Sequence, residues 1–111
     1  MIKFKRYPKI TNLTEKLAEK LVSENHPALS SDWLVLNKIH GANFSVHITK
    51  NEIRFGKRNG WIQKNENFYN YKKIVKPYIS NFKELFQKYS RHYGCETIRI
   101  YGELFGGSYE S

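Results

Sequence analysis

The element Lys38-Ile39-His40-Gly41 has the pattern K-x-x-G and could carry covalent chemistry. A lysine amine is a nucleophile only when it is deprotonated, and its reference pKa of about 10.4 must first be lowered. An apolar strand end with cationic neighbours is an environment that lowers it. Gly41 would let the backbone approach a phosphate or a purine closely, because it has no side chain. The pattern therefore predicts a lysine nucleophile at Lys38.

The same pattern occurs again at Lys57-Arg58-Asn59-Gly60, so it does not by itself choose between the two lysines. About one match is expected by chance in a chain of this composition. The surroundings favour Lys38. The apolar run Trp33–Lys38 predicts a buried strand before it, and the alternating segment Asn43–Thr49 predicts a further strand after it.

The periodicities of the whole chain predict an α+β fold, with antiparallel sheets and flanking helices, in one unit over residues 1–111. Helices are expected over Leu13–Ser23, with Asn12 and Glu15 as a capping box, over Glu66–Ile74, and from Pro77 to about His92. Strands are expected over Trp33–Lys38, Asn43–Thr49, Ile53–Lys57 and Thr97–Leu104.

The charge of the chain bears on its partners. Its 19 Lys and Arg against 10 Asp and Glu give a formal net charge of +9. Such a charge is typical of a domain that binds nucleic acid, although solvated lysines that only maintain solubility account for it equally well. Trp61, Tyr69 and Tyr71 lie among polar residues and are candidates for stacking on bases.

The sequence also limits the compartment and the metal chemistry. It has no apolar run of about 18 residues, and Lys and Pro interrupt the signal-peptide pattern at its start. The single cysteine, Cys95, excludes an intrachain disulfide and fits a reducing compartment, so a cytoplasmic protein without a membrane partner is expected. His92 and Cys95 are spaced like a metal pair, but two ligands are half a zinc site and no metal site is expected.

Three motifs together closely resemble the N-terminal part of the phage-type double-strand RNA ligase family, which are ATP-dependent enzymes of the covalent nucleotidyltransferase superfamily. Residues 38–44, KIHGANF, are similar to motif I, K-x-H-G-T/A-N-F. Residues 56–60, GKRNG, are similar to the K-R-x-G element, and residues 101–107, YGELFGG, to motif III. The order and spacing match from about Tyr7 to Ser111. The resemblance implies a partial adenylation (nucleotidyltransferase) domain that ends just after motif III.

The resemblance implies a nucleotide site with Lys38 as its catalytic residue. Lys38 would take AMP from ATP as lysyl-AMP and release pyrophosphate, while His40 would contact the phosphates. Glu103 would hold a ribose hydroxyl of the nucleotide. The nucleotide-binding residues would be Lys38, Ile39, His40, Asn43, Arg58 and Glu103. Lys38, Arg58 and Glu103 are expected to face a common cleft.

Lys57 and Arg58 would bind the nucleic acid or its phosphates. Arg58, with Lys57 near it, would bind AMP or the nick, and Asn43 would position the reactive phosphate or the nucleic-acid ends. An Arg fork suits phosphate oxygens, which agrees with this role. Asn37 departs from the family, in which many members carry Glu before the nucleophile. That departure puts a metal or adenine contact at this point in doubt.

The resemblance implies an RNA ligase that acts in RNA repair and joins 3′-hydroxyl and 5′-phosphate ends. It would use ATP and Mg²⁺, with Mn²⁺ as a substitute. Its partners would be RNA or a nicked duplex, and it would act in the cytoplasm or, as a viral protein, in the host cell. The family places an adenine-stacking aromatic and motifs IV and V after motif III. This chain alone is therefore not expected to seal a nick.

Two alternatives compete with this assignment. The chain could be a non-catalytic remnant of the fold that binds nucleic acid through its positive charge. It could also be a relative of DNA ligases or capping guanylyltransferases, but those enzymes usually carry Asp where His40 stands.

Overall fold

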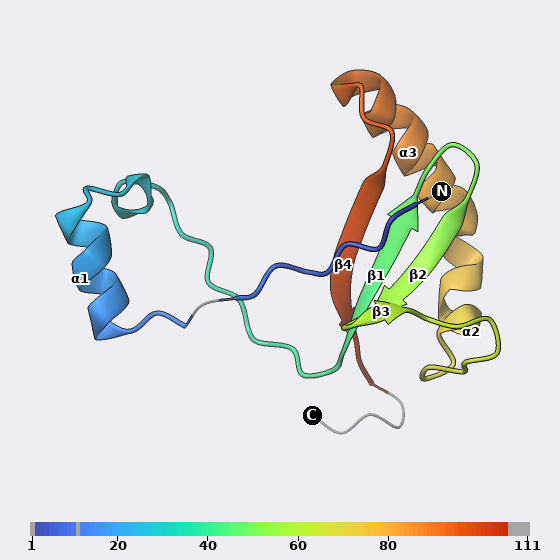
Figure 1. The fold of residues 1–111 in the computed structure, drawn as a ribbon, viewed down its shortest axis with the longest axis horizontal. Helices are drawn as coiled ribbons and strands as arrows, with labels where there is room; N and C mark the ends of the chain where they lie inside the picture. The colour runs from blue at the N-terminus through green and yellow to red at the C-terminus, as the bar shows by residue number, and fades with distance from the viewer. Residues whose placement is uncertain (1, 11, 107–111) are drawn as a thin grey trace. The chain divides into compact units, whose positions relative to one another are not determined.

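The computed structural model describes residues 2–10 and 12–106 and divides the chain into two compact units. The larger unit comprises Met1–Tyr7 and Ile39–Ser111, and the smaller one is Pro8–Lys38. Figure 1 shows the helices and strands of both units. The boundary falls inside the first K-x-x-G element, because Lys38 is the last residue of the smaller unit and Ile39 the first of this part of the larger one.

A four-stranded antiparallel sheet in the order β3-β2-β1-β4 forms the larger unit. Its strands are β1 (Ala42–Ile48), β2 (Ile53–Lys57), β3 (Gly60–Trp61) and β4 (Ile98–Leu104). Strand β1 is central, since it pairs with β2 on one side and with β4 on the other. The α+β class is confirmed, and so are the last three expected strands, with shifts of one residue at some ends.

Two helices lie along one face of this sheet (Figure 1): α2 (Tyr71–Val75) and α3 (Ile79–Tyr93), joined by the short 3₁₀ helix η2 (Lys76–Tyr78). Alternate side chains of a strand point to opposite faces, and β1 turns its apolar set toward these helices. The buried centre of the core is Ile62, Tyr71 and Val75. Packed against it are the half-buried side chains Phe44, Phe55, Phe68, Ile79, Phe82 and Leu104.

The N-terminal segment covers the opposite face of the sheet, where it is fixed by two residues of β4. The Arg99 guanidinium donates a hydrogen bond to the Lys3 carbonyl at 3.0 Å, and the Tyr101 hydroxyl donates to the Lys5 carbonyl at 2.7 Å. Between these contacts, the Phe4 ring packs edge-on against Trp61 with 5.2 Å between the ring centres. Polar positions of the sheet are therefore buried as well as apolar ones.

His47 is the most enclosed of these polar residues. It is fully buried, and its Nε2 atom lies 2.8 Å from the Ser45 hydroxyl, while its Nδ1 has no hydrogen-bond partner in the described part of the chain. Burial, followed by the positive charges of Arg99 and Arg54, lowers the pKa of His47 to about 4. His47 is therefore a neutral part of the fold at pH 7.

Two expectations from the sequence are corrected in the smaller unit. Its helix α1 spans Glu15–Ser23 and begins two residues later than expected, with the Thr14 hydroxyl rather than Asn12 as the cap that accepts from the backbone of Leu17. The buried strand expected over Trp33–Lys38 is wrong: the segment has no strand, and Leu34 and Val35 are 83% and 88% exposed. An apolar run becomes a strand only when a second strand pairs with it, and no described strand does so here.

The helix expected over Glu66–Ile74 is also corrected. It begins only at Tyr71, because Phe68, Tyr69 and Asn70 have positive φ angles of 37°, 54° and 61°, outside the right-handed helical region. Residue 66 lies instead in the loop that precedes this segment. The next helix, expected from Pro77 to about His92, is confirmed as η2 followed by α3.

Candidate functional site

A pocket of about 380 Å³ lies in the larger unit at the end of the sheet where β1 begins. Four segments of the chain meet there: the start of β1, the turn between β2 and β3, residues 68–69, and the end of β4. The lining residues are Gly41, Ala42, Asn43, Lys57, Arg58, Asn59, Phe68, Tyr69 and Glu103. Four predicted site residues, Asn43, Lys57, Arg58 and Glu103, thus line one pocket, and the role of each stays a prediction.

Asn43 and Glu103 are direct neighbours across the β1–β4 ladder. Paired residues of an antiparallel ladder have Cβ atoms about 4.5–5.5 Å apart on the same face, so an amide and a carboxylate lie side by side here. Glu103 is exposed and lies next to the last residue of β4. Its carboxylate is therefore available to accept hydrogen bonds from the hydroxyl groups of a ligand.

Lys57 and Arg58 bring two positive charges to the same pocket. Lys57 ends β2, and Arg58 with Asn59 forms the two-residue turn that leads into β3. The Arg58 side chain is exposed and makes no hydrogen bond or ion pair within the described residues. The two cations differ in this respect, because Lys57 is already held by a carboxylate.

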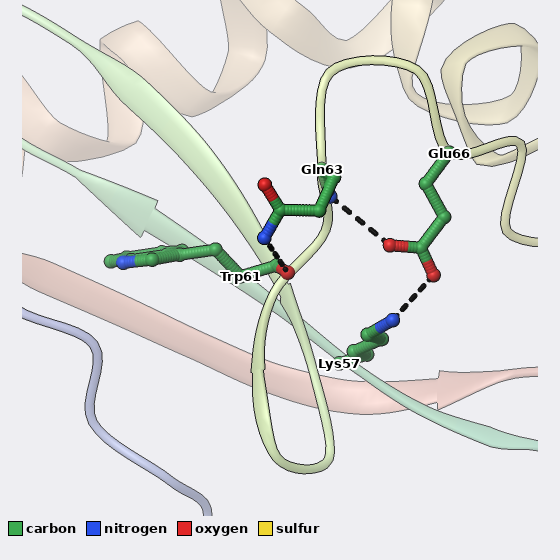
Figure 2. A network of polar contacts seen from close by, with 4 residues as sticks. All are labelled: Lys57, Trp61, Gln63 and Glu66. Carbon is green, nitrogen blue, oxygen red and sulfur yellow. Dashed lines mark hydrogen bonds and ion pairs between the residues drawn. The ribbon is translucent and has the colours of Figure 1, made fainter.

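That carboxylate belongs to Glu66, in the loop after β3 (Figure 2). The Lys57 ammonium lies 2.5 Å from Glu66 Oε2, and the Gln63 backbone amide donates to Glu66 Oε1 at 3.1 Å. These hydrogen bonds, from Lys57 first and Gln63 second, lower the pKa of the Glu66 carboxyl. The Gln63 side-chain amide also donates to the Trp61 carbonyl at 3.4 Å. The loop is therefore held by these hydrogen bonds and by the Lys57–Glu66 ion pair.

Phe68 and Tyr69 form an aromatic side of the pocket. The Phe68 ring is half-buried and stacks on Phe44 with 6.4 Å between ring centres and 17° between planes. Tyr69 is exposed and meets the Phe68 ring edge-on at 5.2 Å. Consecutive left-handed residues without glycine are costly, and such conformations persist where the surroundings enforce them. This segment turns one aromatic ring into the core and presents the next at the pocket.

Packing within the sheet gives a second reason for a glycine at position 41, in addition to the one inferred from the sequence. A Cβ atom at this position would collide with the Leu104 carbonyl oxygen and crowd the Phe105 Cβ. Glycine therefore allows the chain entering β1 to pass close to the end of β4. The close approach that the structure records is between two backbone segments beside the pocket.

Three predicted site residues lie outside the pocket lining. Lys38 belongs to the smaller unit, and its side chain is exposed on a segment without a strand. Ile39 and His40 belong to the larger unit and are exposed. A common cleft for Lys38, Arg58 and Glu103 stays a prediction, in which the pocket supplies the last two residues.

The candidates for base stacking separate into three cases. Tyr71 is a core residue, 5% exposed, so it offers no face to a base. Trp61 has the Arg54 guanidinium 4.0 Å from its ring centre, beside the covered face of the sheet. Tyr69 alone of the three lines the pocket.

The site can therefore offer cations, a carboxylate, an amide and an aromatic ring to one ligand. That set suits a nucleotide or a nucleic-acid end, which combines phosphates, hydroxyls and a base. Among residues 2–10 and 12–106, no three His, Cys, Asp or Glu side chains gather as metal ligands would. Over the same residues, no helix is both long and apolar enough to cross a membrane.

The sequence is similar to those of known proteins. Residues 31–111 match the RNA ligase family. The chain is 33% identical over 115 aligned residues to the mitochondrial RNA-editing ligase 2 of Trypanosoma brucei brucei, an alignment that covers 96% of the chain and 26% of that protein. It is 28% identical over 88 residues to the mitochondrial RNA-editing ligase 1 of the same organism, covering 73% of the chain and 19% of that protein. The chain thus spans about a quarter, or less, of these relatives.

Proposed function

Because the chain belongs to the RNA ligase family, we propose that it carries the nucleotide-binding pocket of an ATP-dependent RNA ligase. In this proposal the protein forms a covalent lysyl-AMP at Lys38 and then joins a 3′-hydroxyl to a 5′-phosphate of RNA. The observation that carries it is the pocket in which Asn43, Lys57, Arg58 and Glu103 converge from three separate motifs. RNA, ATP and AMP are the proposed ligands.

The first step of the proposed reaction is the transfer of AMP. The deprotonated amine of Lys38 attacks the α-phosphorus of ATP, an N–P bond forms, and the bond from this phosphorus to the bridging oxygen breaks. Pyrophosphate leaves with the bonding electrons, and the attacking nitrogen loses its proton to solvent or to a nearby base. Mg²⁺, or Mn²⁺ in its place, enters with ATP as part of the substrate and neutralises the charge on the departing phosphates.

The pocket residues would bind the nucleotide and the RNA end. Glu103 would accept hydrogen bonds from ribose hydroxyls, and Arg58 would donate its fork to phosphate oxygens. Asn43, next to Glu103 on the ladder, would orient the reacting phosphate. His40, which lies outside the lining, would contact the phosphates of ATP before pyrophosphate departs. Tyr69 supplies a ring on which a base can stack.

The place of action proposed for the protein is a reducing compartment, the cytoplasm or, for a viral protein, the host cell. Cys95 is a free thiol in the structure, which agrees with that setting. We expect sealing to need more than these 111 residues, since both relatives are about four or more times as long as the part that aligns.

Labelled nucleotides test the proposal directly. The complete coding sequence that contains these residues is expressed and incubated with α-labelled ATP and Mg²⁺, then denatured. We expect a protein-bound label that persists after denaturation, and matched incubation with α-labelled GTP should give little. Equal or stronger labelling by GTP would favour a capping-type enzyme. RNA binding without any label from ATP would indicate a non-catalytic RNA-binding protein instead.

A further inference from the structure

We propose that Glu66 is a positioning residue, which holds Lys57 at the pocket and sets how strongly this lysine engages the phosphates of RNA. The inference rests on the proposed function, because it takes RNA to bind at this pocket. It concerns a residue that none of the sequence motifs contains.

The Glu66 carboxylate is itself firmly anchored. One of its oxygens meets the Lys57 ammonium at 2.5 Å, and the other accepts from the Gln63 backbone amide at 3.1 Å. The Glu66 amide in turn donates to the Gln63 carbonyl at 3.0 Å, which closes a tight turn. Because both oxygens are engaged, the carboxylate has little freedom, and the lysine tip bound to it is confined as well.

Glu66 reaches the pocket through its ion pair with Lys57. Lys57 lines the pocket and its side chain is 37% exposed, whereas Glu66 is absent from the lining and its side chain is 27% exposed. Glu66 would therefore act on a ligand indirectly, by fixing the position of the Lys57 ammonium and by partly neutralising its charge. Arg58, the adjacent cation of the pocket, has no such anchor in the described part of the chain.

The ion pair has a measurable consequence for phosphate binding. A free cation that neutralises a phosphate releases a condensed counterion, and each such contact adds about 0.7 to the salt slope of log K for a single strand. A lysine already paired with a carboxylate contributes less, because part of its charge is satisfied before the ligand arrives. Removing the carboxylate should free Lys57 to contribute fully.

The test is the salt dependence of binding to a single-stranded RNA of fixed length by the 111-residue chain. We expect Glu66→Gln to bind severalfold more tightly at low salt and to steepen the slope by about 0.5–0.7. Glu84→Gln removes the same charge from an exposed position of α3 outside the pocket and should leave the slope unchanged. In a Lys57→Met background, Glu66→Gln should also leave it unchanged.

Glu66→Asp separates charge from loop structure, since it keeps the carboxylate on a shorter side chain. A slope near that of the unchanged chain is expected, and unfolding curves show that each variant is folded. The inference is wrong if Glu66→Gln leaves the slope unchanged, if Glu66→Asp shifts it equally, or if Glu66→Gln acts without Lys57. Failure of the unchanged chain to bind RNA at low salt would overturn the proposed RNA site, and this inference with it.

Discussion

The two K-x-x-G elements share a pattern but lie in different surroundings. Lys57 ends a strand of the sheet, is held by the Glu66 carboxylate and lines the pocket. Lys38 ends the smaller unit on an exposed segment without a strand, and its side chain makes no ion pair within the described residues. A lysine nucleophile must give up its proton, whereas the Lys57 ammonium is tied to the Glu66 carboxylate by an ion pair. We therefore expect two different tasks for these two similar lysines.

The glycines of the two elements also lie in different surroundings. A Cβ atom at Gly41 would strike the Leu104 carbonyl, while one at Gly60 meets nothing within 4 Å. In the first element the glycine is required by packing. In the second it is not, so the pattern alone does not say why a glycine is there.

The largest expected effect separates the two lysines by activity. In the protein expressed from the complete coding sequence, Lys38→Ala should lower RNA sealing by about 10⁴-fold or more, as loss of a covalent nucleophile does. Lys57→Ala removes one electrostatic contact and should lower it by about 10²-fold. The measurement is single-turnover sealing of a nicked duplex. Equal losses for the two variants would contradict the division of tasks.

The next effect is a loss of stability at acid pH in the larger unit, whose sheet carries the second K-x-x-G element. His47 has a pKa of about 4 in the fold and about 6.5 when unfolded, so between these values the unfolded chain binds more protons. Stability should therefore fall as the pH drops from 6.5 to 4, by roughly 2–3 kcal/mol.

Denaturant unfolding of a Trp33→Phe variant measures this effect, because Trp61 then reports on the larger unit. Its ring lies 4.7 Å from the His47 ring. His92→Asn, at an exposed position of α3, serves as the control and should keep the same pH dependence. A flat profile between pH 6.5 and 4 would show that His47 is not held neutral.

A smaller effect compares the two glycines. Gly41→Ala should destabilise the larger unit by about 1–3 kcal/mol, because either the end of β4 or the start of β1 must move. Gly60→Ala should change stability by less than about 0.5 kcal/mol. Unfolding curves of the two variants, measured side by side, provide the check. A stable Gly41→Ala with a destabilised Gly60→Ala would reverse the comparison.

The smallest effect concerns the exposed apolar run that precedes the first element. In the 111-residue chain, Leu34→Asp should change the free energy of unfolding by less than about 0.5 kcal/mol, since this side chain is 83% exposed. Val46→Ala, in the core of the sheet, should cost on the order of 2 kcal/mol. A large loss of stability in Leu34→Asp would mean that the run is packed after all.

Local periodicity predicted three strands of the larger unit and the helix α1 of the smaller one, but it wrongly predicted a strand in the smaller unit. The alternating segment Asn43–Thr49 identified β1 with a shift of one residue, and the segment Ile53–Lys57 identified β2. The run at Trp33–Lys38 failed as a strand because pairing is a long-range property that apolar content does not reveal. The helix expected from Glu66 failed because three left-handed residues interrupt it.

The candidate site was predictable to the extent that motifs contain it. Asn43, Lys57, Arg58 and Glu103 were all found in the sequence, and the structure adds that they line one pocket. Glu66 was missed, because it forms an ion pair nine positions along the chain, a separation with no periodic meaning in a loop. The backbone register that places Asn43 opposite Glu103 likewise depends on the folded sheet.

The central claim is that Lys38, rather than Lys57, carries the nucleotide. Its most direct test is to incubate the protein from the complete coding sequence with ATP and Mg²⁺, digest it, and identify by mass spectrometry the peptide that has gained AMP. The account predicts AMP on the peptide that contains Lys38, and none in Lys38→Ala. AMP on the peptide that contains Lys57, or on neither peptide, would contradict it.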